Sequence, residues 1–444
     1  MSTSNRSKKA NPSSSTPSDQ TPPQPSLVGL SSRSQHLLTE WNLERTPQQH
    51  EIDDVLDSLK QDLEGSSLGL LEETLDWLRD RGFYELSVPL LEEAWHSEMP
   101  LDFHARVIHD WLGTVFFGLN DPQGVCEILS QITPRLKTLG VSLCSDVCDL
   151  LLEWGLVQEA MPLAEYVHQR QPGDASATFH WGICLKFNQQ WAKAQACFEQ
   201  VLKQSEDPST LWNLGICAVA QHDWAKARHY WKKIGFDLPE GEGEYGAPGE
   251  LSPVRLEDPT GQFPSEVIWG RRLGPARLIL TALPYTHPHY RCGDIVLIDG
   301  VKAGEVEFRG QTHPISPVLG TWKASEGESV HLFGLAASDV SIDESRKALT
   351  QWIQNWGQAG WAIVDWTDLF PQSTPDGTPL IQVGLYVPPK TSSFDLVHDA
   401  LKTCPMITFY HPRWAEWIGE DPQEHTQIWR TLDVQSVYSP RVLH

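Results

Sequence analysis

Apolar residues recur at steps of three and four through most of the first half of the chain. Between residues 36 and 104 they include Val55, Leu56, Leu59 and Leu63, with charged and polar residues between them. This spacing places the apolar side chains on one face of a helix. The pattern continues to about residue 236, so we expect an all-α region over residues 36–236.

The pattern changes to short apolar runs after residue 253. EVIWGRRL, ARLILTAL, GDIVLIDG and GEVEFRG follow one another between residues 264 and 322, separated by turn residues. Such runs predict strands, and the Asp299-Gly300 pair between two of them predicts a hairpin. We therefore expect a small all-β unit over residues 254–325, either barrel-like or a curled sheet. The Gly- and Pro-rich stretch 237–253 is typical of a linker.

Strand and helix patterns alternate in the last segment. Strands are expected at 329–337, 361–366, 380–387 and 406–410, and helices at 343–357 and 393–403. The order βαββαβ matches the ferredoxin-like motif. The fold class expected for the whole chain is therefore multidomain: an all-α region, a small all-β unit, and an α+β module over residues 326–444.

Two segments in the helical region repeat each other at an offset of 33 residues. WGICLKFNQQWAKAQACFEQV begins at Trp181, and LGICAVAQHDWAKARHYWKKI begins at Leu214. A fixed period in this range indicates a helical repeat array. The segments resemble the tetratricopeptide repeat (TPR) family, whose pattern has an apolar-Gly pair in the first helix and small and bulky residues in the second. The matching residues are Trp181-Gly182, Ala194, Phe198 and Val201, then Leu214-Gly215, Ala227, Trp231 and Ile234.

The resemblance covers about residues 140–236, with a looser upstream copy in which Ala160, Ala164, Val167 and Pro172 take the equivalent steps. It implies a solenoid of stacked helix pairs whose first helices line a groove for a protein partner. Helical phase points Thr178, Lys186, Asn213 and Gln221 toward that groove. The pairs of basic residues with which such grooves hold a partner's carboxylate are not evident, which argues against that binding mode.

Charge narrows the range of partners. The 444 residues carry 58 Asp and Glu against 34 Lys and Arg, a net charge of −24. This balance argues against nucleic acid as a partner, and no apolar run reaches the ~18 residues of a membrane span. Residues 36–104 hold 17 Asp and Glu against four Lys and Arg. They suggest a partner with a basic surface. An alternative is intramolecular docking of the acidic repeats on the C-terminal module.

The N-terminal residues 1–35 are expected to form a disordered tail. They hold eleven Ser and five Pro and almost no large apolar residue. Such a segment cannot bury enough surface to offset its ordering entropy. No apolar stretch follows the basic residues near the start, so we expect no secretory signal and a cytoplasmic location.

Tryptophan is abundant, with 19 residues in the chain. Most of them fall at core-like helical steps, but the stretch HPRWAEWIG at 411–419 is harder to bury. Arg413, Trp414 and Trp417 are therefore candidates for an exposed anchor, because Trp and Arg dominate binding hot spots.

Catalytic and metal motifs are sparse. His287, His289 and Cys292 offer imidazole and thiol ligands on one extended segment and form a weak candidate metal site. Asp365 and Asp368 end a predicted strand without a third group that would make them catalytic. No cofactor is expected. The sequence favours a protein-interaction scaffold or adaptor over an enzyme, and the alternative is an enzyme or small-ligand sensor in residues 264–444 recruited by the repeats.

Overall fold

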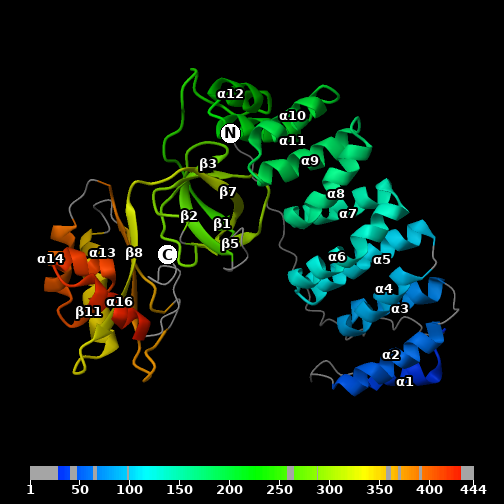
Figure 1. Cartoon of the computed structure of the whole chain (residues 1–444), viewed down its shortest axis with the longest axis horizontal. Coiled ribbons are helices and arrows are strands. Elements are labelled where there is room, and N and C mark those ends of the chain that lie inside the picture. The colour runs from blue at the N-terminus through cyan, green and yellow to red at the C-terminus, as the bar shows by residue number, and fades with distance from the viewer. Residues whose placement is uncertain are drawn as a thin grey trace, which may run out of the picture. The chain divides into compact units, whose positions relative to one another are not determined.

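The computed structural model describes residues 29–40, 48–63, 68–97, 100–257, 265–287, 289–356, 362–368, 372–389 and 393–431. The chain divides into two compact units, residues 1–150 and residues 151–444. Figure 1 shows the helices of both units and the strands of the second. The domain boundaries expected from the sequence stay predictions. In the described part of the chain, no helix is long and apolar enough to cross a lipid bilayer.

The first unit is helical. Its elements are α1 (Ser32–Glu40), α2 (Gln49–Leu63), α3 (Leu68–Asp80), α4 (Tyr84–His96), α5 (Leu101–Gly113), the π-helix η1 (Thr114–Gly118), α6 (Pro122–Leu139) and most of α7 (Val141–Glu153). The apolar face predicted from the spacing is buried, with Leu59 and Leu78 fully covered. Helix α1 begins inside the segment expected to be a tail. The Ser34 hydroxyl lies 2.8 Å from that of Ser58 on α2, so the end of this segment is packed.

The second unit begins with the repeated helix pairs. Its helices here are α8 (Val157–Arg170), α9 (Ala175–Phe187), α10 (Trp191–Leu202), α11 (Pro208–Ala220) and α12 (Trp224–Lys233). Equivalent residues pack in the same way in the two repeated segments that begin at Trp181 and Leu214. A Cβ on Gly182 would collide with Phe198, and one on Gly215 would collide with Trp231. The turns also repeat, since Gln189 and His222 are both left-handed, with φ of 56° and 61°.

A closed barrel follows the repeats. It contains β1 (Leu251–Leu256), β2 (Glu266–Arg272), β3 (Arg277–Leu280), β4 (Ile295–Ile298) and β7 (Ser316–Lys323), in that order around the barrel. Neighbouring strands are antiparallel except β1 and β7, which are parallel and close the barrel. Apolar residues alternate inward and fill its centre, among them Val254, Leu278 and Val296. This confirms the expectation of strands here and makes the unit a five-stranded barrel.

Two features of the barrel region differ from expectation. Asp299-Gly300 does not join a hairpin, because β4 pairs with β3 and β7, whereas β5 (Glu305–Phe308) pairs with β6 (Gln311–Pro314). The stretch 237–253 is packed rather than a free spacer. Leu238 and Tyr245 are buried within it, and β1 begins at Leu251.

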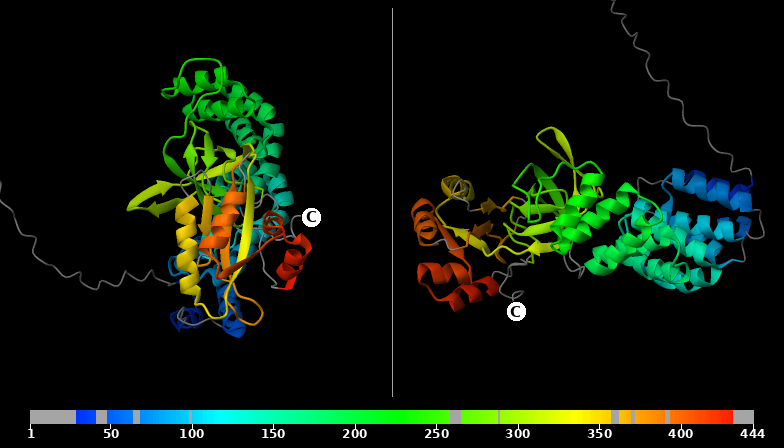
Figure 2. Two further views of the ribbon diagram at one scale, coloured as in Figure 1. Left: turned by 90° about the vertical axis from the view of Figure 1, so that its left-hand side faces the viewer. Right: turned by 90° about the horizontal axis from the view of Figure 1, so that it is seen from above.

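The C-terminal part holds a four-stranded antiparallel sheet in the order β11-β8-β10-β9. The strands are β8 (Glu328–Ala336), β9 (Ala362–Asp365), β10 (Ile381–Val387) and β11 (Ile407–Tyr410). Helices α13 (Ile342–Trp356) and α14 (Phe394–Thr403) lie side by side on one face (Figures 1 and 2). Helices α15 (Pro412–Ile418) and α16 (Pro422–Thr431) follow β11.

Candidate binding sites of the second unit

Lys186 binds a carboxylate of the same chain, and Asn213 in turn binds Lys186. Lys186 lies near the end of α9, and Asn213 lies on α11, the first helix of the next pair. The Lys186 ammonium donates to Asn213 Oδ1 at 2.6 Å and forms an ion pair with Asp299. Asp299 follows β4 of the barrel. The repeats therefore hold an internal carboxylate with one lysine, which Asn213 supports, and not with the pair of basic residues that was considered for a partner's carboxylate.

The Asp299 carboxylate is fully supplied with donors. Besides Lys186, it accepts from the backbone N–H groups of Gly300 at 2.6 Å and Val301 at 3.3 Å, and from Trp212 Nε1 at 3.4 Å. Burial alone would raise the pKa of Asp299, but Lys186 and the backbone donors outweigh it and lower the pKa. The Lys186 and Asp299 side chains are 1% and 2% exposed. The ion pair is therefore desolvated, and the lowered pKa keeps the Asp299 carboxylate ionised at neutral pH.

Apolar contacts surround this ion pair. Residues of α11 and α12 share one buried cluster with Ala276, Leu297 and Leu319 of the barrel. Trp322 Nε1 donates to the Val219 carbonyl at 3.2 Å. The Arg277 guanidinium lies 4.6 Å from the centre of the Trp224 ring. The repeats and the barrel therefore share a core rather than a polar surface contact.

The other two predicted groove residues lie elsewhere. Thr178 is buried, and its hydroxyl lies 3.3 Å from His168 Nδ1, so it contributes to packing between helices. Gln221 is exposed at the end of α11 and donates to Gln195 at 2.6 Å. Of the four predicted residues, the structure brings Lys186 and Asn213 together, and Gln221 remains accessible.

The predicted exposed anchor is mostly buried. Trp414 is 1% exposed and packs against Phe409 and Trp352 beneath the sheet. Trp414 lies on α15 with its side chain in the core, so the expectation that it is exposed is wrong. Trp417 is partly buried against the same core. Arg413 is half-exposed and forms ion pairs with Glu328 and Glu416.

The predicted metal ligands do not form a cluster. Among the described residues, His287, His289 and Cys292 do not make up a group of possible ligands. His287 is buried, His289 is exposed, and Cys292 donates to the Leu280 carbonyl at 3.8 Å. Burial, with Asp294 nearby, raises the pKa of Cys292 to about 11, which keeps the thiol protonated.

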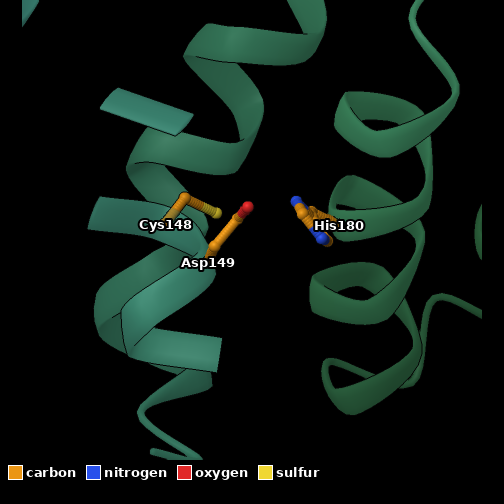
Figure 3. A group of neighbouring side chains, drawn as sticks. All are labelled: Cys148, Asp149 and His180. Carbon is orange, nitrogen blue, oxygen red and sulfur yellow. The ribbon is translucent and has the colours of Figure 1, made fainter. Parts of the chain in front are cut away.

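Figure 3 shows a different trio, Cys148 and Asp149 on α7 and His180 on α9. The first two belong to the first unit and the third to the second, and we assign no site to them.

Asp365 and Asp368, the carboxylates considered for catalysis, both form ion pairs with Arg346, which gives them a structural role.

Two of the buried histidines are His331 on β8 and His411, which directly precedes α15. His331 on β8 packs beside Tyr285 and Trp366, with ring centres 5.5 and 4.9 Å away. Burial lowers the pKa of His331 to about 3, and that of His411 to about 3 as well. Both imidazoles are therefore neutral at pH 7. Nothing in the sequence marked them, because a histidine within a strand pattern has no signature of its burial.

A groove beside the barrel was also not expected from the sequence. It has a volume of about 1380 Å³ and is bordered by β1, β2, the β5–β6 hairpin and the packed stretch after α12. Its aromatic residues include Trp269 and Phe308, whose rings lie 4.7 Å apart. The groove is formed by segments that are distant in sequence, so no local sequence pattern could have predicted it.

No family model and no curated protein matches the chain. Among solved structures it is similar to MamA from Desulfovibrio magneticus RS-1, at 19% identity over 37% of this chain and 92% of that one, with a TM-score of 0.30. YrrB, described as a TPR protein with an unusual peptide-binding site, shares 13% identity over 40% of this chain and 89% of its own, with a TM-score of 0.29. A Podospora anserina kinesin light chain with TPR-like repeats matches at 19% identity over 38% and 92%, with a TM-score of 0.29. It is the chain's own 33-residue repeat that identifies its helix pairs as TPR-like.

Proposed function

We propose that this protein is a protein-interaction scaffold in which the last two TPR-like pairs hold the chain's own barrel and the remaining repeat surface receives a partner. The observation that carries the proposal is the buried ion pair of Lys186 with Asp299, in which Asn213 of the next first helix accepts from Lys186. A basic side chain of a first helix binds a carboxylate here, and charged groups recognise acidic peptide groups in the same way. In this chain the carboxylate is internal, so this part of the groove is already occupied.

The partner surface is then the rest of the helical region. The excess of Asp and Glu over residues 36–104 favours a partner with a basic surface, because opposite charge accelerates encounter. The alternative partner for the acidic repeats is the C-terminal module of the same chain, and we include this intramolecular docking in the proposal. A cytoplasmic location fits a scaffold with eight free cysteines among the described residues.

The C-terminal module is proposed to be ferredoxin-like. The element order from β8 to β11 and the strand order β11-β8-β10-β9 support this assignment. Its face opposite α13 and α14 is covered in part by Leu283, Tyr285 and Cys292 from the segment after β3, and in part by Ile428 of α16. Because these residues cover the sheet face, we propose that the module has a structural role within the scaffold.

Site-specific photo-crosslinking of the full chain in native lysate tests the scaffold. A photoreactive residue at Glu92, exposed on α4 within the acidic residues 36–104, is compared with one at Leu401, which is 51% exposed on α14. We expect a protein adduct at Glu92 that is lost at high salt, and none at Leu401. Adducts at Leu401 alone would contradict the proposal and favour a sensor or enzyme in residues 264–444.

A further inference from the structure

The groove beside the barrel has an apolar wall formed by several exposed large side chains. Phe236, Leu251 and Phe308 are 39%, 38% and 36% exposed, and all three line it. Trp212 and Trp269 line it as well. Large apolar side chains gathered on one exposed surface mark an interaction site. The groove is distinct from the Lys186 site, which is buried.

Arg272 adds a positive charge to this apolar surface. Its guanidinium donates to Ser252 Oγ at 3.4 Å, Ser316 Oγ at 3.1 Å and the Pro275 carbonyl at 3.2 Å. These three acceptors are neutral, and they leave two of its five N–H groups for another acceptor. Among the described residues, no carboxylate forms an ion pair with Arg272. Burial lowers the pKa of Arg272, and the nearby charge of Glu250 partly offsets this effect.

The rim of the groove carries the opposite charge. Asp237 and Glu250 are exposed there, whereas two other lining carboxylates are already paired, Glu240 with Lys232 and Glu244 with Arg277. Arg309 stands on the hairpin side, over the ring of Phe308. The complementary ligand therefore has an anionic group that reaches Arg272, apolar groups around it, and positive charge at its ends.

Size distinguishes a polypeptide from a small molecule. Sites for small ligands occupy about 300–1,000 Å³. At about 1380 Å³ this groove exceeds that range and suits an extended chain. Aromatic and Arg side chains are also the residue types that dominate protein–protein hot spots.

We propose that this groove binds an extended segment of a partner protein, with an Asp or Glu side chain on Arg272, apolar side chains against Trp269 and Phe308, and basic residues outside the rim. The carboxylate forms a bidentate pair with the two N–H groups of Arg272 that remain. A charge-assisted pair of this kind in a partly desolvated site gives the recognition its specificity.

Selection from a random 12-residue peptide display library on the full chain tests the proposal. We expect enriched peptides that share an acidic residue next to aromatic or aliphatic residues. Selected peptides are then synthesised with their acidic residue and with Gln in its place. We expect Arg272→Gln to weaken the acidic peptide by about tenfold or more and to leave the Gln peptide unchanged. Arg291→Gln is the matched control, because Arg291 is exposed on the same unit outside the groove.

Phe308→Ala gives a second variant at an exposed position, should Arg272→Gln disturb folding. It should weaken the acidic and the Gln peptide alike, since it removes the apolar wall from both. An absence of enriched peptides, enrichment without an acidic residue, or equal binding of the acidic peptide to wild type and Arg272→Gln would each overturn the proposal. Binding that requires a free C-terminal carboxylate on the peptide would overturn it too. A failure of the crosslink at Glu92 leaves these outcomes unaffected, so the two proposals fail separately.

Discussion

Replacement of Lys186 by Met is expected to destabilise the second unit strongly. The substitution conserves most of the side-chain length and removes the cation beside Asp299, which is 2% exposed and stays charged in the interior. Breaking a buried ion pair by removing one partner costs about 3–5 kcal/mol. Asp299 keeps the Gly300, Val301 and Trp212 donors, which offset part of the loss. We therefore expect a loss near the lower bound, about 3 kcal/mol in the free energy of unfolding.

Urea unfolding of the full chain, followed by tryptophan fluorescence, measures this loss as a shift of midpoint at constant m-value. Lys193→Met is the matched control. Lys193 is exposed and bonds Gln190 at 2.9 Å, so its replacement should change stability by no more than about 0.5 kcal/mol. Asp299→Asn should also cost several kcal/mol. The double variant should cost less than the sum of the two, because no unpaired charge remains. A loss below about 1 kcal/mol for Lys186→Met, or strict additivity in the double variant, would refute the reasoning.

Three further predictions concern packing and pH. Gly215→Ala should lower the free energy of unfolding by about 1–3 kcal/mol, because the added Cβ would collide with the Trp231 ring. Gly173→Ala is the control and should leave stability unchanged, because Gly173 has open space around it. Thermal unfolding of the two variants measures the difference. Trp414→Ala should cost about 3–5 kcal/mol, since the side chain is core, and a loss within error would show that it is not. His331 and His411 have folded-state pKa values lowered to about 3 by burial, so below pH 6.5 the unfolded state binds protons that the folded state does not. Stability should then fall as pH decreases from 6.5 toward 3, by about 1.4 kcal/mol per pH unit for each histidine, and urea midpoints at pH 7.5, 5.5 and 4.5 check it.

Local patterns predicted the elements of this chain well. The 33-residue offset predicted both helix pairs and the packing of Gly182 and Gly215 against bulky residues of the second helices. The strands after residue 253 and the alternation of strands and helices after residue 326 were also correct. These features depend on neighbours three, four or two residues away, which a sequence displays directly.

Contacts between distant segments could not be predicted in this way. Asp299-Gly300 has the composition of a hairpin turn, but its carboxylate binds Lys186 instead, and Gly300 leaves room for the Trp212 ring. Trp414 lies in a stretch that was expected to be hard to bury, but it belongs to the core, because α15 packs against the residues of the sheet and of α13. The groove around Arg272 is formed by five separate stretches of chain. Each of these outcomes is decided by which elements meet in space.

The separation of 113 residues between Lys186 and Asp299 affects how the protein is made. At a synthesis rate of about 5–20 residues per second, the ribosome adds Asp299 about 6–23 s after Lys186. Helices of a repeat pair form within microseconds to milliseconds. The repeat helices are therefore made well before the carboxylate that neutralises their lysine, and the ion pair can form only after the barrel strands have been synthesised.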